Sequence, residues 1–232
     1  MLARDVMTTP VLAVSPDTDV QAVAALLLEC RISAVPVVDD DGRVQGIVSE
    51  GDLINREDAG TRHRRSWWLE MLQGEEARAR EFLRARGRRA DDVMTRDVVV
   101  AEEDTPLPEI AALLEKHHVK RVPVLRDGKL VGIVSRANLL QGFALSEPAW
   151  PQVEDDRRLR DALHEALEEA GLPMHQVNVT VNSRRARLWG WIDSDTQRQA
   201  ARAAAESTPG VQGLEDNLVV SSPALRAGRG YV

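Results

Sequence analysis

Apolar residues in the first 55 positions follow two periods, and the change of period marks the expected elements. A short apolar run at 11–14 predicts a strand. The next apolar positions have helical spacing and are Val20, Val23, Ala24 and Leu27. We expect this helix to be capped by Asp17 or Thr18 and to end near Glu29.

Two runs rich in β-branched residues follow the helix, at 34–38 and 44–48. The residues between them, 39–42, are acidic and end in glycine, which favours a hairpin turn. Asp52 then opens a short closing helix. The expected order over 1–55 is therefore strand, helix, strand, strand, helix.

The same order recurs over 91–141. Three landmarks stand almost in register: Asp-Val-Met-Thr, Val-Pro-Val and Gly-Ile-Val-Ser. Their copies begin at 5 and 92, at 35 and 122, and at 46 and 132, so the offsets are 87, 87 and 86 residues. Agreement at three landmarks indicates a tandem repeat.

An arginine-rich insert, 56–90, separates the two copies. Glutamates are interspersed through it, and its apolar residues predict one or two amphipathic helices. Trp67 and Trp68 stand at its head. Packing of an indole on the repeat core, a dimer contact and a lid over a ligand are the alternatives for this pair.

A different pattern follows a proline-containing linker at 142–156. An amphipathic helix stops at Gly171, and its apolar face consists of Leu159, Leu163, Ala166 and Leu167. Period-2 alternation then predicts two strands, which contain Val177, Val179 and Val181 and then Leu188, Gly190 and Ile192. A helix from Asp195 to Ser207, capped by Ser194 or Asp195, precedes a last strand and a loose tail at 221–232.

Composition fits an ordinary soluble protein, with 43% hydrophobic and 29% charged residues among 232. The net charge of −7 argues against affinity of the whole protein for nucleic acid. The single cysteine, Cys30, cannot form an internal disulfide, which suits a reducing compartment. The sequence starts without an apolar signal core and contains no run of 18 apolar residues, so we expect a cytoplasmic protein.

The arrangements that familiar enzyme classes need are missing from the sequence. The segment around Ser49 lacks the glycine at position 47 that a nucleophile elbow requires. Cys30 ends a predicted helix among apolar neighbours, which is typical of an inert thiol. His117 and His118 are adjacent, a spacing that does not suit a zinc site. We therefore expect a non-catalytic protein that requires no metal or cofactor.

The repeated motifs resemble those of paired cystathionine β-synthase (CBS) domains, and residues 157–220 resemble a BON domain through Leu188-Trp189-Gly190 and Gly210-Val211. At Ser183-Arg184-Arg185 the chain departs from the glycine that BON domains often have there. The resemblance implies a mixed α+β and α/β fold, a tandem CBS pair followed by a small αββαβ domain. The expected boundaries are 1–55 and 91–141 for the CBS repeats, 56–90 for the insert, 142–156 for the linker, 157–220 for the BON domain and 221–232 for the tail.

The resemblance also implies a ligand, because CBS pairs commonly bind adenine nucleotides or S-adenosylmethionine between their repeats. Ser49 and Asp52 lie at a strand-to-helix turn, where a hydroxyl and a carboxylate can bind a ribose diol. In the family pattern the acid of one repeat works with the basic pair and the first strand of the other. The expected nucleotide site is Ser49, Asp52, Val98, Val99, Lys120 and Arg121. The alternative is that Asp52 only caps a helix and the basic pair is solvated.

The mirror-image site is expected to be weak or empty. Asn138 replaces the acid there, Ser33-Ala34 replaces the basic pair, and Arg136 is a substitute source of positive charge. The residues of this weaker site are Val11, Leu12, Ser33, Ala34, Ser135 and Asn138. We expect one nucleotide site for each chain.

The output is expected from the BON domain, a family proposed to contact phospholipid or proteins. Alternation sends Trp189 and Trp191 to the sheet face opposite Leu188 and Ile192, near several arginines. The alternative is that this face packs on the CBS pair or on a dimer mate. The whole protein is then expected to be a homodimeric sensor, or else a dimerising scaffold that senses no ligand.

Nucleic-acid binding through the insert is a lesser alternative. Arg62, Arg64 and Arg65 beside Trp67 and Trp68 would allow phosphate contact and base stacking. The interleaved glutamates and the overall negative charge weigh against it.

Overall fold

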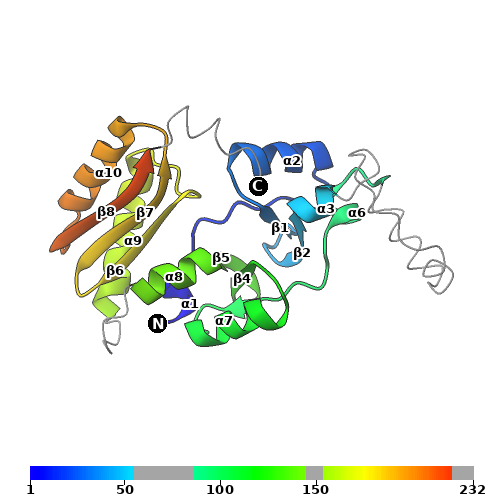
Figure 1. Ribbon diagram of the computed structural model, residues 1–232, viewed down its shortest axis with the longest axis horizontal. Helices are drawn as coiled ribbons and strands as arrows, with labels where there is room; N and C mark the ends of the chain where they lie inside the picture. Colours follow the sequence, from blue (N-terminus) through cyan, green and yellow to red (C-terminus); the bar gives the residue numbers. More distant parts are fainter. Residues whose placement is uncertain (55–85, 145–153, 221–232) are drawn as a thin grey trace. The chain divides into compact units, whose positions relative to one another are not determined.

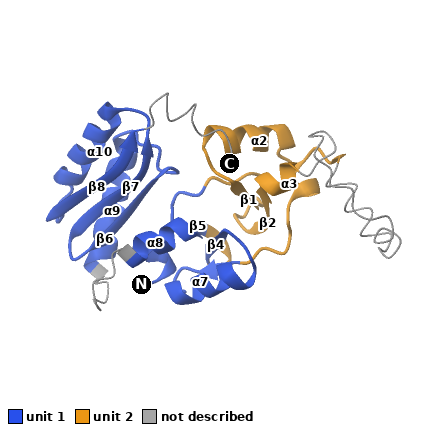
Figure 2. Ribbon diagram, in the orientation of Figure 1, with its two compact units in different colours: residues 1–11, 100–125, 131–232 blue, residues 12–99, 126–130 orange. Residues whose placement is uncertain are grey.

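The computed structural model describes residues 1–54, 86–144 and 154–220 (Figure 1). The paired tryptophans Trp67 and Trp68, most of the arginine-rich insert and the tail at 221–232 lie outside these ranges. The described chain divides into two compact units (Figure 2): unit 1 contains 1–11, 100–125 and 131–232, and unit 2 contains 12–99 and 126–130. Of the helices in the described ranges, none combines the length and the apolar character that crossing a bilayer requires.

Unit 2 holds most of the first repeat. Helix α2 (Val20–Glu29) packs on an antiparallel hairpin of β1 (Ala34–Val38) and β2 (Val44–Ser49), which leads into α3 (Glu50–Ile54). The short helix α6 (Ala90–Val93) closes the unit. Valines from the helix and the hairpin form its core with Ala90 and Met94, as the apolar periods predict.

The opening segment of the second repeat belongs to unit 2, on the hairpin of the first. Thr95 and Ile47 exchange two backbone hydrogen bonds of 2.9 and 3.0 Å. Met94, only 3% exposed, lies on Gly46, where a Cβ would come within 2.3 Å of the methionine sulfur. Glycine at this position therefore makes room for the methionine of the repeated Asp-Val-Met-Thr motif.

The strand expected at 11–14 is reduced to one bridge, which joins Val14 to Val37. Val14 donates to the Pro36 carbonyl and accepts from Val38. Extending this parallel ladder toward the N-terminus would need an N–H from residue 36, and proline has none. The proline of the Val-Pro-Val motif thus limits the ladder.

The expected cap of α2 was also wrong by one or two residues. The N-cap is Asp19, whose Oδ1 accepts from the Gln21 N–H at 2.7 Å. Asp17 instead forms an exposed ion pair with Arg89, and the Thr18 hydroxyl contacts Ser15. The end of the helix at Glu29 is as expected.

Unit 1 repeats this arrangement. The sheet has the order β3 (Ala101–Glu102), β4 (Arg121–Arg126) and β5 (Lys129–Ser135), and helices α7 (Leu107–Lys116) and α8 (Arg136–Ala144) accompany it. The opening segment of the first repeat lies on this hairpin: Thr8 and Ile133 exchange backbone hydrogen bonds of 2.9 and 3.1 Å. Met7 lies on Gly132 as Met94 lies on Gly46, with a Cβ-to-sulfur distance of 2.2 Å.

The C-terminal part of unit 1 has the expected order of helix, two strands, helix and strand. Helix α9 (Glu154–Glu169) precedes the hairpin of β6 (Val177–Asn182) and β7 (Arg185–Ile192). Helix α10 (Asp195–Ser207), capped by Ser194, then returns the chain to β8 (Gly213–Val220), which pairs parallel to β7. Leucines of α9, alternate residues of the strands and alanines of α10 form one core.

The β6–β7 hairpin closes without the glycine that BON domains often have. Ser183 and Arg184 both have positive φ, 51° and 60°, as a two-residue hairpin turn requires. Asp156, which is 4% exposed, accepts from both of their N–H groups at 2.8 and 2.9 Å. A buried carboxylate from α9 therefore holds a turn that glycine would otherwise favour.

The N-terminal helix α1 (Ala3–Val6) contacts both α8 and β6 (Figure 1). Arg157, Arg160, His164 and Asn178 of the C-terminal domain bond to the segment 4–9. We call these four residues the clasp. They attach the C-terminal domain to the second repeat through the beginning of the chain.

Substitution of Gly46 tests the close packing of Met94 on this glycine. Gly46→Ala is expected to cost about 1–3 kcal/mol of unfolding free energy, because its methyl group overlaps Met94. Gly46→Ala with Met94→Ala should cost less than the sum of the single variants. Denaturant unfolding of the full chain measures both. Gly51→Ala is the control, since a Cβ there meets its nearest atom at 3.6 Å; an equal loss in the control would contradict the overlap.

Acidification should lower the stability of the fold through His164, because the protonated ring is costly to bury. Its ring Nε2 bonds to the Thr9 carbonyl. Burial is the main cause that lowers the pKa of His164, and Arg160 acts in the same direction; the hydrogen bond to Thr9 and the charges of Glu168 and Asp161 oppose this shift. Stability is therefore full above the unfolded pKa of about 6.5 and falls as the pH drops through the lower folded value. Thermal unfolding between about pH 7.5 and 5 should show a shallower decline in His164→Gln than in wild type; parallel curves would contradict this.

Candidate functional site

Each repeat carries one strand-to-helix turn at the expected site. In unit 2 the turn joins β2 to α3, with Ser49 before the helix and Asp52 as its third residue. In unit 1 the equivalent turn joins β5 to α8 and carries Ser135 and Asn138. The short polar side chain at the third helical position caps the free N–H before the helix in both turns.

Asp52 has one oxygen occupied and one largely available. Oδ2 accepts from the Ser49 N–H at 2.8 Å and from the Ser49 hydroxyl at 2.6 Å. Within the described ranges, Oδ1 accepts only a long hydrogen bond, 3.4 Å from the Thr95 hydroxyl. Since the side chain is half-buried, Oδ1 retains lone pairs for a hydroxyl donor.

Asn138 uses both ends of its amide inside the protein. Its Oδ1 accepts from the Ser135 N–H and hydroxyl at 2.8 and 2.7 Å. Its Nδ2 donates to the Val6 carbonyl at 2.9 Å and to the Thr8 hydroxyl at 3.2 Å. The residue is 3% exposed, so it offers a ligand far less than Asp52 does.

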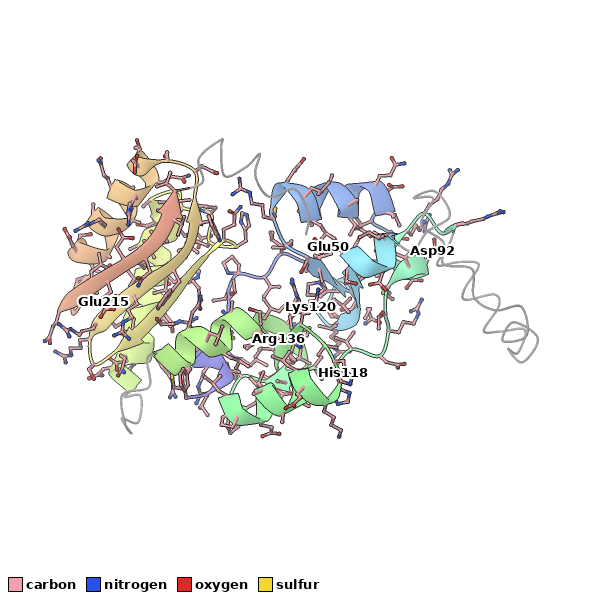
Figure 3. The ribbon with its side chains drawn as sticks, viewed as in Figure 1. Glu50, Asp92, His118, Lys120, Arg136 and Glu215 are labelled. Carbon is pink, nitrogen blue, oxygen red and sulfur yellow. The ribbon has the colours of Figure 1, made fainter. Side chains whose placement is uncertain are left out.

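The two turns also differ in the charge beside them. Lys120 and Arg121 stand where β4 begins, and Ser33-Ala34 holds that place before and in β1. Arg136 opens α8, whereas Glu50 opens α3; Figure 3 labels both, together with Lys120. Unit 1 therefore carries cations where unit 2 carries neutral residues and an acid, which is a favourable place for phosphate.

The remaining residues expected at the nucleotide site are distributed over both units. Val98 and Val99 lie with Ser49 and Asp52 in unit 2, whereas Lys120 and Arg121 lie in unit 1. The two valines are half-buried in a stretch that precedes β3, and they are not part of a strand. Among the expected site residues, hydrogen bonds join Ser49 to Asp52 and Ser135 to Asn138.

For the weaker site, Val11 belongs to unit 1 and Leu12 to unit 2. Both are half-buried and lie outside any strand, for the reason given above for Pro36. Ser33 is half-buried and its carbonyl accepts from the Glu50 N–H at 3.0 Å, while Ala34 is buried in β1.

Two threonines at these turns were not expected from the sequence pattern. Thr95 contacts Asp52 and Thr8 contacts Asn138. Both end the Asp-Val-Met-Thr motif, so the repeat itself was the signal. The threonines reach these turns because the opening segment of each repeat packs on the hairpin of the other repeat. Local spacing in the sequence does not reveal this exchange.

The indoles of β7 lie on the sheet face opposite the helices. Leu188 and Ile192 are buried in the core, and Trp189 and Trp191 between them are half-buried. Trp191 pairs across the strands with Val219, which is 41% exposed. On the same face Arg187 donates to Glu215 at 2.6 Å, and this hydrogen bond lowers the pKa of Glu215.

Other candidate chemistry is weak in the described chain. Within 1–54, 86–144 and 154–220, no group of three or more His, Cys, Asp or Glu residues is placed to hold a metal ion. Cys30 caps the end of α2, and burial raises the pKa of its thiol, which disfavours the reactive thiolate.

Comparison with known families agrees with these features. The CBS domain matches residues 3–58 and 90–144, and the BON domain matches residues 155–222. Both match ranges extend beyond the described residues.

Among curated relatives, the uncharacterized protein MJ1426 of Methanocaldococcus jannaschii is 35% identical over 154 residues, which cover 62% of this chain and 91% of the relative. The CBS domain-containing protein CBSX1, chloroplastic, of Arabidopsis thaliana is 34% identical over 134 residues, 55% of this chain and 57% of that protein. A crystal structure of CBSX2 in complex with AMP has a TM-score of 0.55 at 28% identity, covering 63% of this chain and 99% of that one. The chain therefore belongs to the CBS domain family, with two CBS domains followed by a C-terminal BON domain.

Proposed function

We propose that the protein is a non-catalytic regulator that binds one adenine nucleotide for each chain, with the ribose at Asp52. The observation that carries the proposal is the difference between the two turns. Asp52 keeps Oδ1 available for a ribose hydroxyl, whereas the amide of Asn138 is engaged on both sides. The similarity to CBSX2, a protein crystallised with AMP, supports this ligand class.

The phosphate is assigned to the basic pair of unit 1. Lys120 is exposed and Arg121 is half-buried, and charge-assisted hydrogen bonds are the interactions that hold phosphate oxygens best. Val98 and Val99 offer apolar contacts for the base. S-adenosylmethionine, which has a ribose and adenine but no phosphate, is the competing ligand, and Lys120 and Arg121 favour the nucleotide over it.

The regulator is proposed to act as a cytoplasmic homodimer in which the nucleotide changes the placement or exposure of the BON domain. Such coupling needs two domain arrangements that bind the nucleotide with different affinities. The BON domain then presents its surface to a protein partner or to phospholipid.

Asp52→Ala tests the nucleotide site. Loss of the ribose contact should raise the Kd for AMP by about tenfold to hundredfold, because a hydrogen bond to a charged group contributes about 1.5–3 kcal/mol. Calorimetric titration of the full chain with AMP, ADP, ATP and S-adenosylmethionine measures it. Asn138→Ala, at the equivalent turn, should change the Kd much less than Asp52→Ala does. Equal losses in the two variants would contradict a single competent site, and absence of binding by wild type to all four compounds would contradict the sensor.

A second function is favoured by the part of the BON sheet face that is exposed at β8, whereas the same face is buried at Asn178 and Thr180 of β6. Trp191 and the exposed Val219 form an apolar spot beside Trp189 and the Arg187–Glu215 pair. Apolar aromatic residues with an arginine are typical of docking surfaces. In this reading the CBS pair is a dimerising scaffold, and the working surface is the sheet.

Replacement of both indoles tests this surface. Trp189→Ala with Trp191→Ala should leave the Kd for AMP unchanged and weaken capture on phosphatidylglycerol-containing vesicles by about tenfold, since buried tryptophan anchors carry much of the binding energy at interfaces. Co-sedimentation measures capture. Leu28→Ala, an exposed apolar residue of α2, serves as control. Unchanged capture by the double variant would assign the indoles to internal packing.

A further inference from the structure

The segment 4–9 is held from one side by the second CBS repeat. Thr8 pairs with Ile133 through two backbone hydrogen bonds. Asn138 donates to the Val6 carbonyl at 2.9 Å and to the Thr8 hydroxyl at 3.2 Å. Met7 lies on Gly132 at the same hairpin. The turn that stands in the place of a ligand site therefore binds the chain itself.

The BON domain holds the same segment from its other side. Arg160, 6% exposed, donates to the carbonyls of Met7 at 2.7 Å and of Arg4, while its Nε bonds Val179 of β6. Arg157 forms a 2.9 Å ion pair with Asp5, whose side chain is fully buried. A buried guanidinium needs such acceptors, because it stays charged and its desolvation is costly.

One carbonyl joins the two sides. The oxygen of Val6 accepts from Asn138 of the CBS repeat at 2.9 Å and from Asn178 of the BON domain at 3.2 Å. Asn178 also donates to Gln141 of α8 at 2.5 Å. Both asparagines are buried, so each amide needs its acceptors, and displacement of the Val6 carbonyl would leave both amides short of a bond.

We call the two hydrogen bonds that the Val6 carbonyl accepts from Asn138 and Asn178 the joint. The residue type at 138 decides whether this joint can form. An aspartate has no N–H with which to reach the Val6 carbonyl, and its charged oxygen would face that carbonyl at hydrogen-bond distance. Position 52 shows the other choice, because its carboxylate caps the turn in the same way but leaves Oδ1 available. Compared with Asp52, Asn138 offers a ligand no available carboxylate oxygen and instead donates a hydrogen bond to the Val6 carbonyl.

We propose that Asn138 fixes the BON domain to the second CBS repeat. The turn that carries Asn138 binds the Val6 carbonyl, and the BON domain binds the same carbonyl through Asn178. The BON domain then moves with the second repeat as one body. This inference does not depend on nucleotide binding, and it is tested without nucleotide.

Hydrogen exchange of the full chain, followed by mass spectrometry, compares Asn138→Asp with wild type. Peptides covering α1 and α9 should exchange about tenfold faster in the variant, because the joint opens locally. Asn217→Asp makes the same chemical change at an exposed position of β8 and should exchange like wild type. Unchanged exchange of α1 and α9 in Asn138→Asp would overturn the proposal.

A cycle of alanine variants keeps the proposal testable if Asn138→Asp fails to fold. Asn138→Ala and Asn178→Ala should each accelerate exchange of α1. Because both amides donate to one oxygen, the double variant should accelerate it by less than the product of the two single effects. A purely multiplicative result, or an unaffected α1 in both single variants, would show that the two amides do not act on a common joint.

Discussion

The seating of a methionine on a glycine is the contact on which the CBS part of the molecule depends. Met94 reaches Gly46 and Met7 reaches Gly132, in each case from the segment that opens the other repeat. Burial of a methionine contributes about 1.5–3 kcal/mol, and a β-carbon on either glycine would remove the space. This contact places the following threonine at the strand-to-helix turn, so Thr95 meets Asp52 and Thr8 meets Asn138. It also explains why the compact units do not coincide with the repeats along the sequence.

Much of this architecture follows from local patterns. Helical and alternating periods locate α2, β1, β2 and the elements of the BON domain, because each element buries one face. The failures have local physical causes as well. The strand at 11–14 is lost since Pro36 has no N–H to give it, and the cap is Asp19 because α2 begins at Val20.

The two strand-to-helix turns were predictable in kind and not in detail. The residue types at 52 and 138 indicate one acidic turn and one neutral turn. What periodicity cannot reveal is that the neutral turn has a partner, since Val6 lies 132 residues away in sequence. The clasp was not predicted for the same reason. Arg160 and Asn178 donate to backbone carbonyls, and because every residue has a carbonyl, the sequence does not indicate which one accepts.

The shared carbonyl of Val6 sets an order for folding. Its partners Asn138 and Asn178 lie 132 and 172 residues further along the chain. Contacts of such high sequence separation form slowly, because the intervening chain must be ordered before they stabilise anything. During synthesis the first residues to emerge are therefore among the last to reach their final contacts. Until the BON domain has emerged, the buried face of α1 stays open to solvent and to chaperones.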